Sequence, residues 1–194
     1  MIYYIFRFIF FLIFKACFSY KAYGQENIPK KGGFIIASNH ISHIDPPLIG
    51  VASGRTLSYM AKQELFEGRY AWLFRHWHVF PVKRGSGDLA AVRKALSILK
   101  KGEGLLLFPE GARQNNSFLS EVQPGIGFIA AKSNVPVIPA FVSGTDMVLP
   151  KGAKSLKIAP VQVRFGEQIL IERSMPYQDI AQLIMHNIRQ LHGR

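Results

Sequence analysis

The segment most informative about chemistry is residues 38–45, where His40 precedes Asp45 by five positions, just after the apolar run 33–37. Positions five apart on a regular helix are separated by about 140°, so the two side chains can meet only in a turn. In such a turn, Asp45 can bond one imidazole nitrogen and stabilise the imidazolium that forms when the other nitrogen takes a proton. The alternative is that His40 ends a strand and Asp45 caps the following helix.

A histidine base must activate some nucleophile, and the sequence provides no obvious protein candidate. It contains neither the G-x-S-x-G turn of serine hydrolases nor a Gly-Lys-Ser/Thr phosphate-binding loop. A base in this setting can activate a hydroxyl of the substrate itself, for direct attack on an activated acyl group.

Two other segments, 80–84 and 108–113, place charged residues and a glycine after strand-like runs. The residues concerned are Lys83, Arg84, Glu110, Gly111 and Arg113. Arginine matches phosphate oxygens with paired donors, and glycine lets the backbone approach a ligand closely. These loops are candidates for binding an anionic substrate, whereas the ordinary alternative is solvated charge at strand ends.

A metal site is a competing interpretation, since five side chains could in principle contribute ligands: His40, His43, Asp45, His76 and His78. The first two histidines fit neither the H-E-x-x-H helix pattern nor a cysteine-based site. The sequence therefore predicts no metal.

A dinucleotide site is a second competing interpretation. Residues 85–90 and 125–130 both fit the relaxed pattern G-x-G-x-x-A. Neither lies in the first strand–helix unit, where the dinucleotide fingerprint belongs. We expect these glycines simply to start helices.

The charge balance favours anionic partners. Lys and Arg number 24 against 12 Asp and Glu, a net charge of +12, which suits nucleic acid, anionic lipid headgroups or a phosphorylated substrate. No basic helix or zinc-finger spacing supports nucleic-acid binding, so none is predicted. The single cysteine, Cys17, excludes an intrachain disulfide.

The N-terminal residues 1–14 are apolar except for Arg7, and Lys15 follows them. The run is shorter than the ~20 apolar residues of a spanning helix, and its charges are not placed as in a signal peptide. Aromatic residues and snorkelling cations suit a helix lying in the bilayer interface. The alternative, a first helix buried in the core, is less favoured because apolar side chains occupy every face.

Strand-like and helix-like segments alternate along the rest of the chain. Strands are expected at 33–37, 56–61, 79–82, 105–108, 135–142 and 158–165, and helices at 70–77, 88–101, 125–132, 178–191 and after Asp45. This alternation predicts a single layered α/β domain, with a mixed, largely parallel sheet flanked by helices.

Four segments, taken in order, resemble the motif blocks of the glycerolipid acyltransferase family, typified by 1-acyl-sn-glycerol-3-phosphate acyltransferase. They are His40 with Asp45 (H-x-x-x-x-D), 80–84, 108–113 (F-P-E-G-T-R) and 135–139. One H-x-x-x-x-D arises often by chance, whereas four blocks in order at these spacings are specific.

The resemblance implies an enzyme that moves a fatty acyl group from acyl-CoA or acyl carrier protein to a lysophospholipid, in the first place 1-acylglycerol-3-phosphate. Glycerol-3-phosphate or another lysolipid is an alternative acceptor. A more distant alternative is that the chain is a non-enzymatic basic protein that binds a membrane or nucleic acid. No cofactor is implied. We expect residues 1–20 to be a membrane-associated helix, residues 21–194 to be the acyltransferase domain, and the protein to lie on the cytoplasmic face of the cell membrane.

The resemblance also implies roles for single residues. His40 and Asp45 catalyse, while a second group holds the phosphorylated acceptor: Arg84, Glu110, Gly111 and Arg113. The chain departs from the family pattern at Ala112, where threonine is usual, and at Lys83, where many bacterial members carry an acid. Both departures bear on the acceptor more than on the reaction.

Overall fold

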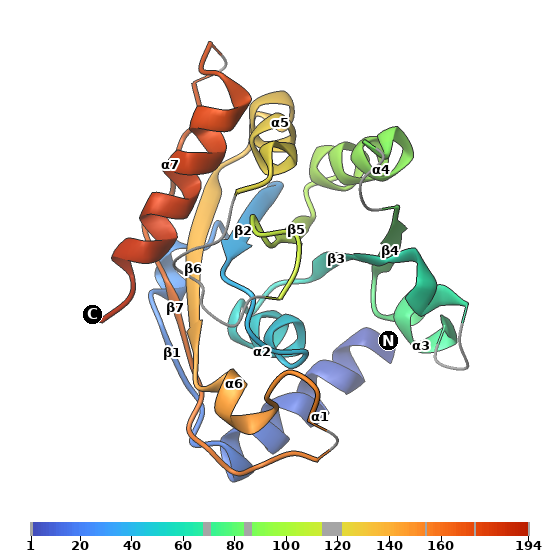
Figure 1. Ribbon diagram of the computed structural model, residues 1–194, viewed down its shortest axis with the longest axis vertical. Helices are drawn as coiled ribbons and strands as arrows, with labels where there is room; N and C mark the ends of the chain where they lie inside the picture. The colour runs from blue at the N-terminus through green and yellow to red at the C-terminus, as the bar shows by residue number, and fades with distance from the viewer. Residues whose placement is uncertain are drawn as a thin grey trace.

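A seven-stranded sheet lies between two layers of helices (Figure 1). The computed structural model describes residues 2–67, 71–83, 87–113, 122–153, 155–172 and 174–193, apart from the side chains of Leu73 and Arg75.

The sheet has the strand order β1-β7-β6-β2-β5-β3-β4. The strands are β1 (Lys21–Tyr23), β2 (Phe34–Ser38), β3 (Leu57–Lys62), β4 (Val79–Val82), β5 (Gly104–Leu107), β6 (Val137–Ser143) and β7 (Gln162–Phe165). Strands β6, β2, β5, β3 and β4 run parallel to one another, and only the step from β6 to β7 is antiparallel. The prediction of a mixed, largely parallel sheet is confirmed, although β7 begins four residues later than the expected 158.

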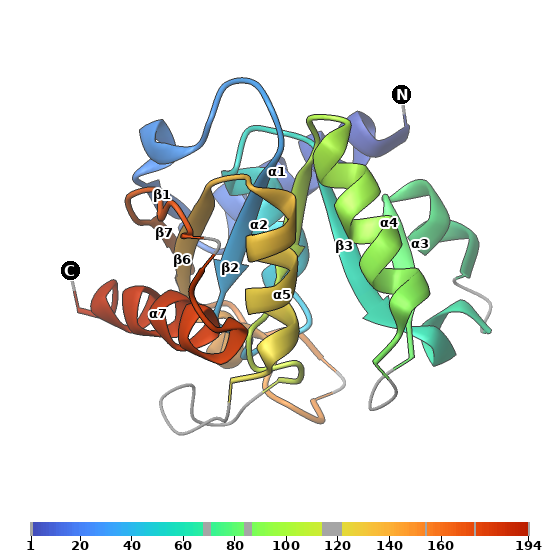
Figure 2. The same ribbon diagram turned by 90° about the horizontal axis from the view of Figure 1, so that it is seen from above.

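The helices cover both faces of this sheet. They are α1 (Ile2–Cys17), α2 (Asp45–Ala52), α3 (Ala71–His76), α4 (Leu89–Lys100), α5 (Pro124–Ser133), α6 (Thr145–Val148) and α7 (Tyr177–Gln190), with 3₁₀ turns η1 (Gln25–Asn27) and η2 (Gln63–Phe66). One hydrophobic cluster joins the sheet to α1, α2 and α6, and the other joins it to α4, α5 and α7. Figures 1 and 2 show these two groups of helices on opposite sides of the sheet.

Strand β2 is the centre of the fold. All five of its residues are buried, with Phe34 and Ile36 in the first cluster and Ile35 and Ala37 in the second. Continuous apolar runs of this kind are typical of parallel strands that are covered on both faces. Because β2 pairs with β5 on one side and β6 on the other, the loop after it emerges in the middle of the sheet edge.

Helix α1 is buried along one side and exposed along the other. Tyr3 and Phe14 are buried in the cluster beneath α2, and the hydroxyl of Tyr3 accepts a hydrogen bond from the N–H of Leu57 at 3.2 Å. The other side of the helix exposes a row of large apolar side chains: Ile2, Tyr4, Ile5, Phe8, Ile9, Phe11, Leu12 and Ile13. No helix in the described part of the chain is long and apolar enough to cross a membrane.

The glycines of the 125–130 pattern have a packing role. A Cβ atom on Gly127 would collide with the carbonyl oxygen of Tyr177, where α5 crosses α7, whereas a Cβ on Gly125 would meet nothing within 4 Å. Gly127 therefore lets two helices approach closely. Residues 85 and 86 of the other G-x-G-x-x-A pattern lie outside the described residues.

We expect Gly127→Ala to lower the free energy of unfolding by about 1–3 kcal/mol, since overpacking forces helices apart. Chemical denaturation of the purified protein measures this. The matched control is Gly125→Ala, which should leave stability unchanged or raise it by ~0.5 kcal/mol, because alanine favours the helix. Equal stability of the two variants would contradict the close crossing of α5 and α7.

Candidate active site

The turn after β2 is fixed by Asn39. Its side-chain Nδ2 donates to the carbonyl oxygen of Val142 at 2.9 Å, and its Oδ1 accepts from the N–H of the same residue at 2.7 Å. Asn39 is buried. Its side chain bonds to the backbone of β6 and so continues the pairing of β2 with β6 one residue beyond the end of β2. The chain then turns through residues 40–44 before α2 begins.

His40 and Asp45 meet in this turn. Nδ1 of His40 lies 2.8 Å from Oδ2 of Asp45. The same oxygen accepts hydrogen bonds from the N–H groups of Ile41 (2.8 Å) and Ser42 (2.7 Å). An ionised carboxylate only accepts hydrogen bonds, so Nδ1 carries the proton and Nε2 is left as the basic nitrogen.

The interpretation of Asp45 as a helix cap is wrong. Asp45 is the first residue of α2, Ile44 occupies the capping position, and no side chain caps this helix. The carboxylate instead binds the turn that precedes the helix, because its Oδ2 is drawn to the two N–H groups and the imidazole there.

Thr145 holds the other oxygen of Asp45. Its hydroxyl donates to Oδ1 at 2.6 Å from the first residue of α6, 100 positions further along the chain. Both Thr145 and Asp45 are fully buried. Sequence analysis missed Thr145, since nothing in local spacing signals a contact with Asp45.

The segment 108–113 covers the other side of the histidine. The Phe108 ring stacks on the His40 ring, with centroids 4.0 Å apart and an interplanar angle of 16°. The imidazole is therefore held by a carboxylate at one nitrogen and an aromatic face along its plane. Two of the segments selected from the sequence thus come together at His40.

Glu110 lies beneath the same turn. It is buried, and its Oε2 accepts a hydrogen bond from the backbone N–H of His40 at 3.3 Å. No group in the described part of the chain hydrogen-bonds its buried Oε1. Burial raises the pKa of Glu110 to about 7; the charge of Asp45 adds to this, while the His40 N–H and Arg189 oppose it. A substantial share of Glu110 is therefore protonated at neutral pH.

Gly111 and Arg113 complete the part of this loop that is described. Gly111 adopts φ +65°, a left-handed conformation that favours glycine, and its N–H closes the turn on the carbonyl oxygen of Phe108 at 3.0 Å. Partial burial and the positive charge of Arg113 lower the pKa of His43, so Arg113 acts electrostatically on the His40 turn. Arg84 lies outside the described residues.

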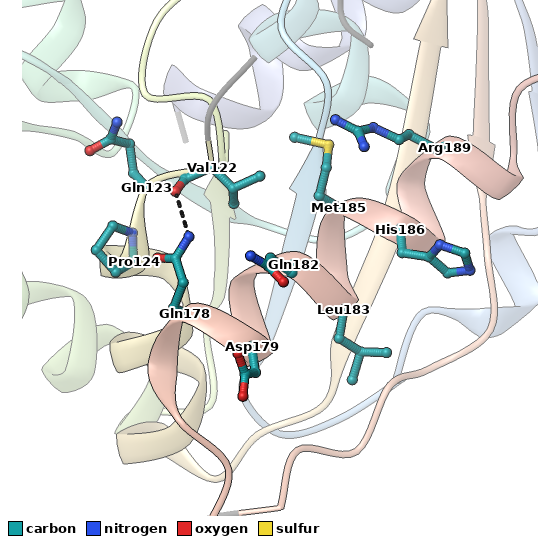
Figure 3. Close-up of a pocket in the computed structure, with 10 residues that line it drawn as sticks. All are labelled: Val122, Gln123, Pro124, Gln178, Asp179, Gln182, Leu183, Met185, His186 and Arg189. Carbon is teal, nitrogen blue, oxygen red and sulfur yellow. Dashed lines mark hydrogen bonds between the residues drawn. The ribbon is translucent and has the colours of Figure 1, made fainter. Parts of the chain in front are cut away.

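A groove of about 1050 Å³ adjoins the Glu110 loop (Figure 3). It is lined by the residues before and at the start of α5 and by one side of α7: Val122, Gln123, Pro124, Gln178, Asp179, Gln182, Leu183, Met185, His186 and Arg189. The N–H of Gln123 donates to the carbonyl oxygen of Pro109 at 2.9 Å, and Arg189 is the cation that acts on Glu110. Sequence analysis missed Arg189, which sits on an ordinary amphipathic helix.

The described residues contain no group of three or more His, Cys, Asp or Glu side chains that could hold a metal ion. His76 bonds the carbonyl oxygen of Trp72 at 2.7 Å, and the His78 ring packs edge-on against Tyr3 of α1.

Comparison with known proteins decides the family. An acyltransferase family model matches residues 19–143. The chain belongs to the acyltransferase family. The 1-acyl-sn-glycerol-3-phosphate acyltransferase of Bacillus subtilis is 31% identical over 151 residues, covering 77% of this chain and 73% of that protein. The predictions of family and enzyme class are confirmed.

Other acyltransferase relatives agree with this assignment. A chloroplastic 1-acyl-sn-glycerol-3-phosphate acyltransferase of Brassica napus is 28% identical over 69% of this chain, which spans 40% of that protein. The crystal structure of the 1-acyl-sn-glycerophosphate acyltransferase of Thermotoga maritima superposes with a TM-score of 0.74 at 27% identity, covering 90% of this chain and 73% of that one. The α/β fold prediction is therefore confirmed, while the roles of the individual site residues stay predictions.

The raised pKa of Glu110 predicts a pH-dependent stability. The folded protein holds this proton more tightly than the unfolded chain, so stability should fall as pH rises from the usual glutamate pKa of 4.5 to about 7. Glu110→Gln should remove the loss, and should be more stable than wild type at pH ~8 by at most about 3 kcal/mol.

Denaturation of wild type and variant at pH ~5 and ~8 measures this difference. Glu67→Gln, at an exposed carboxyl, is the control and should follow the wild-type curve. Parallel pH profiles for wild type and Glu110→Gln would show that Glu110 ionises freely in the folded protein.

Proposed function

We propose that this chain transfers a fatty acyl group from a thioester, acyl-CoA or acyl carrier protein, to the free hydroxyl of a lysophospholipid. The first acceptor to consider is 1-acylglycerol-3-phosphate, which would give phosphatidate, because the relatives named above carry that activity in their names. The observation that carries the proposal is the contact of His40 with the buried Asp45, which leaves Nε2 as a base.

In the proposed reaction, Nε2 of His40 removes the proton of the acceptor hydroxyl while that oxygen attacks the thioester carbonyl carbon. The tetrahedral intermediate then collapses, the carbon–sulfur bond breaks, and the imidazolium returns its proton to the leaving thiolate. The products are an ester and a free thiol. Asp45 keeps Nδ1 protonated and stabilises the imidazolium between the two steps.

We assign the acceptor phosphate to Arg113, together with Arg84, whose role rests on the family resemblance. The position of Arg113 supports this assignment, because its positive charge lowers the pKa of His43, three residues from the base His40. Within the described residues Oε1 of Glu110 has no hydrogen-bond partner, so it is available to a polar group of the acceptor, and Gly111 keeps the turn between Glu110 and Arg113 tight. The alternative acceptors are glycerol-3-phosphate, which carries the same phosphate monoester, and other lysophospholipids, which carry a phosphodiester.

We propose that α1 holds the protein on the cytoplasmic face of the membrane. The support is its row of exposed aromatic and aliphatic side chains, with Phe8 62% exposed. Lys15 is exposed at the end of the helix, where it can reach lipid phosphates. The acceptor is then taken from the bilayer on which the enzyme rests.

We expect His40→Ala to lower the rate of transfer by about 10²–10⁴-fold, the usual contribution of a general base. The assay offers a panel of lysolipids and both thioester types to the purified protein and reads the products by mass spectrometry. His43→Ala, at an exposed histidine of the same turn, is the matched control and should retain far more activity. A fully active, folded His40→Ala variant would contradict the general-base mechanism, and so would an acyl-enzyme trapped on Ser42.

We expect Arg113→Ala to raise the acceptor KM about tenfold to ~100-fold, the effect of losing a hydrogen bond to a charged group. Arg84→Ala should act in the same way. Arg113→Lys should rescue only partly, since lysine loses the paired-donor geometry. Acceptor and donor are titrated separately for each variant. A rise in donor KM with an unchanged acceptor KM would move these loops to the donor site.

A further inference from the structure

A second group of exposed apolar side chains lies on α6 and on the connection from α6 to β7. Met147 is 55% exposed, Leu156 60% and Ile158 86%, and the lysines Lys151 and Lys157 are exposed among them. We call these five residues the α6 patch. The sequence from 146 to 160 contains three lysines and one acidic residue, Asp146, which is exposed next to Met147, so the patch combines apolar side chains with a net positive charge.

The connection is folded back on itself. The N–H of Lys157 donates to the carbonyl oxygen of Val148 at 2.8 Å, which brings the chain around Lys157 back to the end of α6. Further along, the N–H of Val161 donates to the carbonyl oxygen of Phe18 at 3.0 Å, just past the end of α1. The patch is therefore fixed at both ends to ordered parts of the fold.

The α6 patch borders the catalytic turn. Thr145, two residues before Met147, donates to Asp45 at 2.6 Å. The hydroxyl of Ser42 donates to the carbonyl oxygen of Leu149 at 3.0 Å. These two hydrogen bonds attach the segment that carries the patch to the same turn that holds His40.

The patch also lies on the same side of the sheet as α1. Val148 of α6 is buried in the hydrophobic cluster that contains Tyr3, Phe14 and Phe18, and Figure 1 shows α1, α2 and α6 together below the sheet. The helix that carries Met147 and the helix α1 therefore belong to the same layer of the fold.

We propose that the α6 patch is a second lipid-contacting surface, which enters the interface of an anionic bilayer and sets the His40 turn beside the lipid headgroups. Apolar side chains interleaved with lysines are the composition that suits this boundary. An acidic protein partner would attract the lysines but would not account for three exposed apolar side chains beside an apolar helix. The proposal rests on the proposed transfer to a membrane lipid.

The test is the partition of the purified full chain onto vesicles of phosphatidylcholine and phosphatidylglycerol. The double variant Leu156→Ser with Ile158→Ser should bind about tenfold more weakly or worse, since two apolar side chains no longer leave water. The matched control is Leu89→Ser with Leu170→Ser: these leucines are 65% and 79% exposed, but their neighbours pack on the opposite face of the sheet. The control should bind as wild type does.

The two lysines of the α6 patch provide an independent test of the proposal. Lys151→Gln and Lys157→Gln should each weaken binding to the anionic vesicles about fivefold, and should have little effect on vesicles of phosphatidylcholine alone. An equal loss on both kinds of vesicle would contradict a role for headgroup charge.

A fluorescent label keeps the proposal testable if a serine variant folds poorly. In a chain with Cys17→Ser and Ile158→Cys, an environment-sensitive dye at position 158 should report an apolar surrounding when vesicles are added. A dye that stays in water while the protein is vesicle-bound overturns the proposal, as does unchanged binding of the folded Leu156→Ser, Ile158→Ser variant.

Activity separates this proposal from the proposed function. The Leu156→Ser, Ile158→Ser variant should lose transfer to lysolipid in vesicles at least about tenfold, in line with its binding, and keep transfer to lysolipid dispersed in detergent. A wild-type protein that transfers to no lysolipid would overturn the proposed function, while the vesicle and dye measurements would still decide the α6 patch.

Discussion

The rest of the site depends on the buried carboxylate of Asp45. A charge taken out of water costs several kcal/mol unless hydrogen bonds replace its hydration, and Asp45 receives four: from the imidazole of His40, the N–H groups of Ile41 and Ser42, and the hydroxyl of Thr145. Three of these donors come from the turn after β2 and one from α6, after β6. Because β2 and β6 are neighbours in the sheet, the strand order itself brings the donors together.

A second carboxyl group completes the electrostatic arrangement around His40. Glu110 follows β5, on the other side of β2, and holds the backbone N–H of His40 while Asp45 holds the ring. Burial and the nearby charge of Asp45 raise the pKa of Glu110 to about 7, which Arg189 and the hydrogen bond only partly offset. Near neutral pH the site can thus keep one carboxyl charged beside the imidazole and the other partly neutral, a division that environment alone produces in chemically similar groups.

Local signals in the sequence predicted the centre of this arrangement. The apolar run of β2 and the five-residue spacing of His40 and Asp45 are both contained in short stretches of chain. The role of Thr145 could not be predicted from local signals, because its contact with Asp45 spans 100 residues and follows from how β6 pairs with β2. The alternative in which Asp45 caps α2 is wrong for the same reason, because its carboxylate accepts hydrogen bonds from the surrounding turn and from α6.

The surfaces on the two sides of the sheet, from which His40 is approached, differ in polarity. On the side of α1 and α6 the surface is apolar with exposed lysines. On the side of α5 and α7 a groove lined largely by polar side chains, including Arg189, leads to the Glu110 loop. Strand β2 is covered on both faces, and in the described part of the chain the base is flanked by the loops that follow the strands, where α/β folds bind their ligands. The proposed transfer of an acyl group from a water-soluble thioester to a membrane lipid uses one approach of each kind, and His40 lies where these loops meet.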